Sequence, residues 1–306
     1  MKQFILVAFL ALTTNFASAC DVCGCSMNAF SMGLMQNQNT PYIGLRYSFA
    51  QFHASINHNT TNEGYEYSND TYQRIDAVGR INLSENFKLN FQVPFLINIM
   101  EGSHQTVTTS GIGDPTIILT YHPFKGNIKW ENHSIVLGAG VKAPLGKFDQ
   151  EDNGELINPN FQMGTGSIDF LVNANYTYRK KSFGYNVEAA YKMNTKNRSN
   201  YRYGNQFNGA LNGFYMLERI KTTTLFYTGG YFERAAVNLE NNKNVFNTGG
   251  FGLFGNLGAQ VYIKKFRVGV LCQLPIYQKF KTDQLTTINS KPRFTLDLIY
   301  TLGKDK

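Results

Sequence analysis

The feature that most constrains this chain is a period-two alternation of apolar and polar residues. Phe183, Tyr185 and Val187 form one row, for example, and Asn186 and Glu188 interleave with them. Such alternation predicts β-strands that present one apolar face and one polar face. We mark twelve segments of this kind, near residues 41–54, 71–84, 87–101, 113–124, 133–144, 166–179, 182–195, 205–218, 221–234, 250–264, 266–278 and 291–303.

The connections between these segments alternate in length. Short ones lie at 85–86, 125–132, 180–181, 218–220 and 264–265, and long ones near 55–70, 102–112, 145–165, 196–204, 235–249 and 279–290. An up-and-down barrel of the bacterial outer membrane has short periplasmic turns and long extracellular loops. A soluble β-sandwich or a smaller calyx shares the strand alternation but gives no reason for alternating loop lengths. An even strand number also places both termini on the periplasmic side.

Composition agrees with a barrel. Charged residues make up 16% of the chain, and the mean hydropathy is -0.28, because a barrel spreads its apolar residues over every second position. Inside hydrocarbon every backbone N–H and C=O must find a partner, so strands can span only as a closed barrel. We therefore predict an all-β fold, a transmembrane antiparallel up-and-down β-barrel of about 12 strands, located in the outer membrane.

The N-terminus indicates export. Lys2, the apolar run Phe4–Leu12 and the small residues Ala17-Ser18-Ala19 are typical of a secretory signal peptide. We predict three regions: a signal peptide at 1–19, a Cys-rich periplasmic segment at 20–40, and the barrel at 41–306.

Three cysteines, Cys20, Cys23 and Cys25, open the predicted mature chain. Thiolates are soft ligands that select Cu(I) or Zn, so a copper or zinc site is one interpretation. A disulfide in the oxidising periplasm is another, and lipidation of Cys20 is a third. The fourth cysteine, Cys272, lies in an apolar row and is predicted to face lipid.

The polar rows predict the lining of the lumen. The basic residues of these rows are Arg46, Arg74, Arg80, Lys88, Lys142, Arg179, Lys192, Arg267 and Arg293, and the acidic ones are Asp76, Asp169, Glu188 and Asp297. This excess of basic residues favours an interior that attracts anions. In the alternative interpretation the charges pair across the lumen and fill it. Aromatic girdles are predicted from Tyr47, Phe49, Tyr176, Tyr178, Tyr227 and Tyr231.

Charge and histidine placement limit the partners and chemistry. The formal net charge is +8, which for an exported protein indicates contact with acidic lipopolysaccharide rather than nucleic acid. A barrel hydrolase needs a serine beside a histidine that acts as base. His133 and Ser134 are neighbours on opposite faces of a strand, so they cannot form that pair. We therefore expect no enzymatic activity.

One short motif carries a resemblance. The sequence Gly111-Ile112-Gly113-Asp114-Pro115, leading into the strand 116–124, resembles the Gly-x-Gly-Asp strand start of outer-membrane barrels of the phenol-degradation MetA-pathway family and of FadL-like transporters of hydrophobic compounds. The hairpin rhythm over 41–303 is also similar. The resemblance implies transport and no catalytic residues.

The two ends of the chain add two comparisons. The Cys-x-x-Cys-Gly-Cys start is similar to that of some exported barrels associated with metal handling. The chain ends Gly303-Lys-Asp-Lys306, whereas barrels usually end on an aromatic residue that the assembly machinery reads. An internal signal at 294–302 is the alternative.

The leading hypothesis is a passive channel or transporter for small solutes, with hydrophobic compounds as one class. The first alternative is a plugged barrel that captures copper or zinc with its N-terminal cysteines. The second is a lipid hydrolase of the outer membrane.

Overall fold

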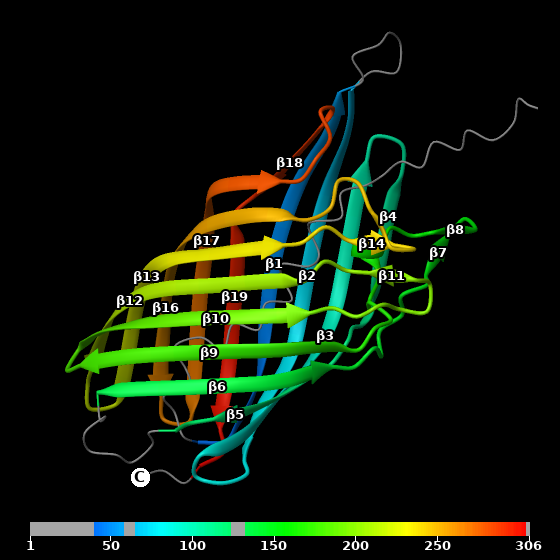
Figure 1. Ribbon diagram of the computed structural model, residues 1–306. Coiled ribbons are helices and arrows are strands. Elements are labelled where there is room, and N and C mark those ends of the chain that lie inside the picture. The colour runs from blue at the N-terminus through cyan, green and yellow to red at the C-terminus, as the bar shows by residue number, and fades with distance from the viewer. Residues whose placement is uncertain (1–39, 58–64, 124–131, 304–306) are drawn as a thin grey trace, which may run out of the picture.

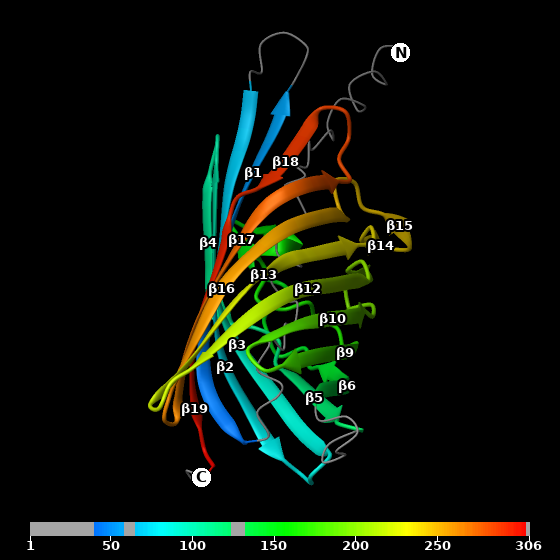
Figure 2. The same cartoon turned by 90° about the vertical axis from the view of Figure 1, so that its left-hand side faces the viewer.

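The computed structural model describes residues 40–57, 65–123 and 132–303, which form an antiparallel β-barrel (Figures 1 and 2). Its fourteen hydrogen-bonded strands make twelve wall strands, because β4 with β5 and β18 with β19 are each one wall strand interrupted by a kink. The predicted fold class is confirmed. The wall strands are β1 (Tyr42–Asn57), β2 (Tyr65–Asn82), β3 (Phe87–Gly102), β4 (Thr106–Ile112), β5 (Thr116–Tyr121), β6 (His133–Lys142), β9 (Asp169–Lys180), β10 (Phe183–Met193), β12 (Gln206–Glu218), β13 (Thr222–Ala235), β16 (Gly250–Ile263), β17 (Phe266–Phe280), β18 (Thr286–Ser290) and β19 (Arg293–Thr301).

The barrel closes between the first and last strands. β1 pairs with β2 on one edge and with β19 and β18 on the other, so that the blue and red strands lie side by side in Figure 2. Tyr42 is in register with both Arg80 and Thr301. The amide of Leu302 donates to the carbonyl of Pro41 at 2.8 Å. Both ends of the described wall therefore lie at the short-turn end, which is the periplasmic end in this class of barrel.

The two faces of each strand separate as the alternation predicts. On β3, Val93 and Phe95 point outward and are exposed, whereas Lys88 and Asn90 point into the barrel and are buried. Cys272 lies on the outward row of β17 and is half-buried. An outward apolar band around a polar interior is the arrangement that a lipid bilayer requires of a barrel.

The prediction that Tyr227 and Tyr231 belong to an outward aromatic girdle is wrong. Tyr227 and Tyr231 lie on the inward row of β13, and Tyr231 is only 9% exposed. The outward row of this strand includes Thr228 and Gly230. Because polar and small residues interrupt that row, hydrophobicity alone does not identify the lipid-facing side of β13.

The wall is taller at the extracellular end than predicted. Most of the predicted loop 102–112 is the strand β4, which pairs with β3, and most of 279–290 belongs to β17 and β18. The sequence of β4 does not show the apolar–polar alternation, because its outward residues are the polar Thr106, Thr108 and Ser110. A strand that continues beyond the hydrocarbon has no need of an apolar outward row.

The extracellular connections carry short elements of their own. The segment 143–168 contains the hairpin β7 (Glu151–Asp152) and β8 (Glu155–Leu156) and the 3-10 helix η4 (Pro159–Phe161). β11 (Tyr201–Arg202), β14 (Leu239–Glu240) and β15 (Lys243–Asn244) form a small separate sheet. In the described part of the chain, no helix is long and apolar enough to cross a bilayer.

Candidate functional site in the barrel lumen

A kink in the barrel wall organises the site. Gly113, Asp114 and Pro115 interrupt the wall strand between β4 and β5, and proline has no N–H with which to continue the ladder. β5 pairs with both β3 and β6, whereas β4 pairs with β3 alone. The kink therefore turns Asp114 toward the segment 143–168, which follows β6.

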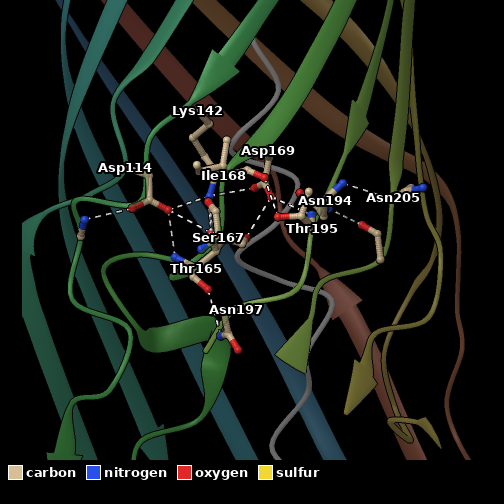
Figure 3. Close-up of polar contacts among 12 residues, drawn as sticks. Asp114, Lys142, Thr165, Ser167, Ile168, Asp169, Asn194, Thr195, Asn197 and Asn205 are labelled. Carbon is tan, nitrogen blue, oxygen red and sulfur yellow. Dashed lines mark hydrogen bonds and ion pairs between the residues drawn. The ribbon is translucent and has the colours of Figure 1, made fainter. Parts of the chain in front are cut away.

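Asp114 connects the kink to that segment (Figure 3). Its Oδ1 accepts a hydrogen bond from the amide of Gly146 at 2.9 Å, and its Oδ2 accepts one from the amide of Thr165 at 2.8 Å. The Nζ of Lys142 lies 2.6 Å from the same Oδ2. One buried carboxylate thus holds both ends of the 143–168 segment against the wall.

Lys142 joins a second carboxylate to this network. Its Nζ lies 2.8 Å from Oδ2 of Asp169, and the side chains of Lys142 and Asp169 are 6% and 0% exposed. Asp169 also accepts hydrogen bonds from the Ser167 hydroxyl at 2.9 Å and from the Thr195 amide at 3.1 Å. Buried charges are tolerated when they are paired and fully hydrogen-bonded, so this cluster depends on all of its members.

The 143–168 segment reaches into the lumen. The carbonyl of Phe161 accepts hydrogen bonds from the Thr109 hydroxyl at 2.6 Å and from Asn98 at 3.4 Å, which ties η4 to the inner face of β3 and β4. Packing at the kink is close. A Cβ on Gly113 would lie 3.0 Å from the carbonyl oxygen of Met163, so any side chain there needs its neighbours to shift.

Apolar side chains gather inside the extracellular half of the barrel. Phe52 and Tyr72 meet edge to face with ring centroids 5.9 Å apart, and Tyr72 stacks on Phe161 at 5.3 Å. Ile288 and Met100 belong to the same buried cluster. All of these except Phe161 come from inward strand positions. We call this group the lumen apolar cluster; its buried members are Ala50, Phe52, Ala54, Tyr72, Met100, Val107, Phe161 and Ile288.

A cavity of about 60 Å³ adjoins the cluster. Tyr72 belongs to both, and Pro94, Leu96 and Met163 add further apolar surface to the cavity wall. The remaining lining is mainly polar: Gln73, Arg74, Asn98, Asp114, Lys142, Pro159, Asn160, Gln162, Gly164, Thr165, Lys192 and Tyr203. The lumen therefore offers a narrow space with an apolar wall beside hydrogen-bonding groups.

Most inward charges pair with one another. Arg267 lies 2.9 Å from Asp297. Arg293 donates two hydrogen bonds to Glu233, at 2.8 and 2.9 Å, and its guanidinium lies 4.0 Å from the centre of the Phe254 ring. Such pairing fills the interior, in agreement with the alternative interpretation that the charges pair across the lumen. A further pair joins Arg74 to Asp76 at 2.6 Å.

The structure places the sequence-predicted lumen residues as follows. Arg46, Glu188 and Asp297 lie half-buried on inward rows, and Arg179 lies at the periplasmic rim, 2.5 Å from Glu218. The remaining ones are buried inside the barrel: Arg74, Asp76, Arg80, Lys88, Lys142, Asp169, Lys192, Arg267 and Arg293. Cys20, Cys23 and Cys25 lie outside the described residues.

Three inward acidic residues, Asp70, Asp114 and Glu233, are absent from that prediction, and all are buried. Asp70 lies on the same inward row as Arg74 and Asp76, but the predicted loop 55–70 includes it. Glu233 lies on the same row as Tyr227 and Tyr231, which the prediction assigns outward, so the same error excludes it. Asp114 lies within the kink, where strand parity does not assign it to either face. Counting these acids reduces the basic excess expected for the lumen.

The described residues include His133, from the hydrolase alternative, but not the three N-terminal cysteines of the metal alternative. His133 faces outward and contacts the Tyr176 hydroxyl at 2.9 Å, in an aromatic group that includes Tyr178. No group of three or more His, Cys, Asp or Glu side chains that could hold a metal ion occurs in the part of the chain that the structure describes.

Comparisons with known proteins agree with this geometry. A family model described as "Putative MetA-pathway of phenol degradation" matches residues 36–266. The fold is similar to that of an outer membrane channel from Pseudomonas putida F1, with a TM-score of 0.59 and 14% identity over 87% of this chain and 96% of that chain.

More distant structural matches include a FadL homologue from Pseudomonas aeruginosa, with a TM-score of 0.44 and 10% identity over 87% of this chain and 91% of that one. The CymD monoaromatic hydrocarbon channel matches with a TM-score of 0.43 and 10% identity, over 88% and 90% of the two chains. No curated protein matches the chain in sequence.

Proposed function

Because the chain belongs to the MetA-pathway family of phenol degradation and folds as an outer-membrane β-barrel, we propose that it is a passive channel for small apolar solutes. The family match covers most of the described barrel, and the resemblance expected from the Gly-x-Gly-Asp motif is confirmed. The solute class is argued below from the lumen of this chain.

The observation that carries the proposal is the lumen apolar cluster. Side chains that point into a barrel are usually polar in channels for hydrated solutes, because water fills their lumen. Here Phe52, Tyr72 and Phe161 place aromatic surface inside the wall. Tyr72 lines the cavity, and Phe52 and Phe161 become accessible when side chains move aside. Contact with these rings favours an apolar solute and does not replace the water that an ion loses.

Mutual pairing of the lumen charges supports the same solute class. Lys142 lies between two carboxylates, and Arg293 donates two hydrogen bonds to Glu233. A charge that is already paired has less attraction left for a passing ion. The lumen is therefore suited to uncharged solutes with a hydrogen-bonding group at most.

The size of the cavity limits how a solute passes. It measures about 60 Å³, whereas a protein cavity that accepts benzene measures about 150 Å³. A single-ring solute therefore needs side chains to move aside. Phe161 and Met163 are the ones we expect to move, since they come from a connecting segment rather than from the wall.

Uptake by intact cells tests the proposal. Cells that express the protein should take up radiolabelled toluene faster than cells that lack it, while uptake of glycerol stays the same. Correct folding is checked by the change in gel mobility on boiling. Equal toluene uptake with and without folded protein would refute the proposal, and faster uptake of glycerol alone would assign a hydrophilic pore instead.

We also propose contact with lipopolysaccharide at the extracellular boundary. Arg234 and Lys279 are both in register with Phe251, on either side of it, and all three lie on outward rows. The apolar outward rows of these strands end there, so the two cations lie where phosphates of the outer leaflet are expected. Arg234→Gln with Lys279→Gln should lower lipid A binding by the purified barrel; unchanged binding would contradict this.

A further inference from the structure

Three consecutive periplasmic turns carry pairs of basic residues. They join β9 to β10, β12 to β13 and β16 to β17, and these six strands are neighbours in the wall. Adjacent turns are two strand spacings apart, about 10 Å. We call the six basic residues of these turns the basic rim: Lys180, Lys181, Arg219, Lys221, Lys264 and Lys265.

The basic rim has little acidic compensation. Within these three turns the one acidic residue is Glu218, and it already pairs with Arg179 at 2.5 Å. Five of the six rim residues are exposed and Lys265 is half-buried. The rim therefore presents a concentrated positive charge along one side of the periplasmic end.

Backbone conformation gives a second, independent observation. The β9–β10 and β16–β17 turns are two-residue loops, and their first residues, Lys181 and Lys264, have φ of 55° and 51°. This left-handed conformation favours glycine, asparagine or aspartate. Two separate turns thus use lysine where the backbone favours other residues, which points to a use for the charge.

Aromatic side chains place the rim at the membrane surface. Phe183 contacts Tyr215 with ring centroids 4.9 Å apart, and Phe266 contacts Tyr300 at 5.1 Å. These outward rings lie at the strand ends next to the turns, the position of an interface girdle. Lys180 follows Tyr178 on the same outward row. The rim cations therefore lie at the level of lipid headgroups.

We infer that the basic rim binds the phosphate groups of anionic phospholipids, such as phosphatidylglycerol, in the periplasmic leaflet. Clustered Lys and Arg beside a membrane attract anionic lipid. The short turns keep these side chains beside the girdle rings, where a headgroup reaches them more readily than a periplasmic protein does. Ile220, fully exposed between Arg219 and Lys221, adds an apolar contact at the same surface.

Native mass spectrometry of the whole detergent-solubilised barrel tests this inference. The probes are phosphatidylglycerol and phosphatidylethanolamine with identical acyl chains. The wild type should retain phosphatidylglycerol preferentially. The variant Lys180→Gln, Lys181→Asn, Lys264→Asn, Lys265→Gln should lose at least about tenfold of that preference, because each cation near an anionic surface contributes roughly a fivefold factor.

The matched control removes four exposed extracellular cations to which no lipid contact is assigned, with Arg198→Gln, Arg202→Gln, Lys243→Gln and Lys281→Gln, and should keep the preference. Because both variants lose the same net charge, a non-specific charge effect would lower binding equally in both and overturn the inference. An unchanged preference in the rim variant, with the gel shift of a folded barrel, would also overturn it. So would rim-dependent binding of purified peptidoglycan without lipid preference.

Discussion

Replacing Lys142 with methionine tests the buried network at the wall kink. Lys142→Met keeps the length of the side chain but leaves Asp114 and Asp169 facing each other without their shared cation. The three side chains are no more than 6% exposed, so bulk water compensates poorly for the lost charge. Removing one partner of such a buried pair costs about 3–5 kcal/mol. We expect this loss in the free energy of unfolding.

Urea unfolding of the barrel in lipid vesicles, followed by the gel mobility shift, measures that loss. The control is Arg179→Met, which breaks the pair with Glu218 at the exposed rim and should cost at most about 1 kcal/mol. Adding Asp169→Asn to Lys142→Met removes one uncompensated charge and should recover part of the stability. If Lys142→Met costs no more than Arg179→Met, the network does not stabilise the kink.

Three further predictions concern Gly113 at the kink, Phe161 in the lumen and the loop that contains Asp283. Gly113→Val should cost about 1–3 kcal/mol in the same unfolding assay, because a Cβ there already lies 3.0 Å from Pro94; an unchanged midpoint contradicts this. Phe161→Ala should lower stability by about 3–5 kcal/mol yet speed toluene uptake, and slower uptake by folded protein would count against a gate at this ring. Partial burial raises the pKa of Asp283, but hydrogen bonds from Thr286 and Asn247 outweigh it and hold the pKa below its ordinary value. Asp283 should therefore order its loop fully above the ordinary carboxyl pKa, and this order should be lost as the pH falls through the lowered pKa. A pH titration of the Thr286 amide chemical shift, compared with the same titration of Asp283→Asn, measures this. A midpoint at the ordinary pKa refutes the prediction.

Strand number and strand faces could be predicted from sequence because the bilayer imposes them. Where lipid contacts the wall, the outward row is mostly apolar, and Val93 and Phe95 on β3 illustrate this. The prediction failed where that apolar signal is weak, as on β13, where Thr228 and Gly230 interrupt the outward row. β4 continues beyond the hydrocarbon with Thr106 and Thr108 on its outward row, and so its alternation carried no apolar signal.

The candidate site was only partly predictable. Lys142 and Asp169 were found because strand parity assigns them to the lumen, and the structure brings them within 2.8 Å. Asp114 and Phe161 could not be found in this way, because the first lies within a kink and the second lies in a connecting segment. Their roles depend on how the 143–168 segment folds into the barrel, and no periodic pattern encodes that path.

Thiol blocking tests most directly whether apolar solutes pass through the lumen. Leu96→Cys lies in the cavity wall, and Ile97→Cys, one residue later on β3, faces outward. Both are made with Cys272→Ser and with the three N-terminal cysteines replaced by serine. A bulky methanethiosulfonate reagent should stop protein-dependent toluene uptake by the Leu96→Cys barrel and leave the Ile97→Cys barrel active. Uptake that persists in fully modified Leu96→Cys protein would contradict passage through the lumen.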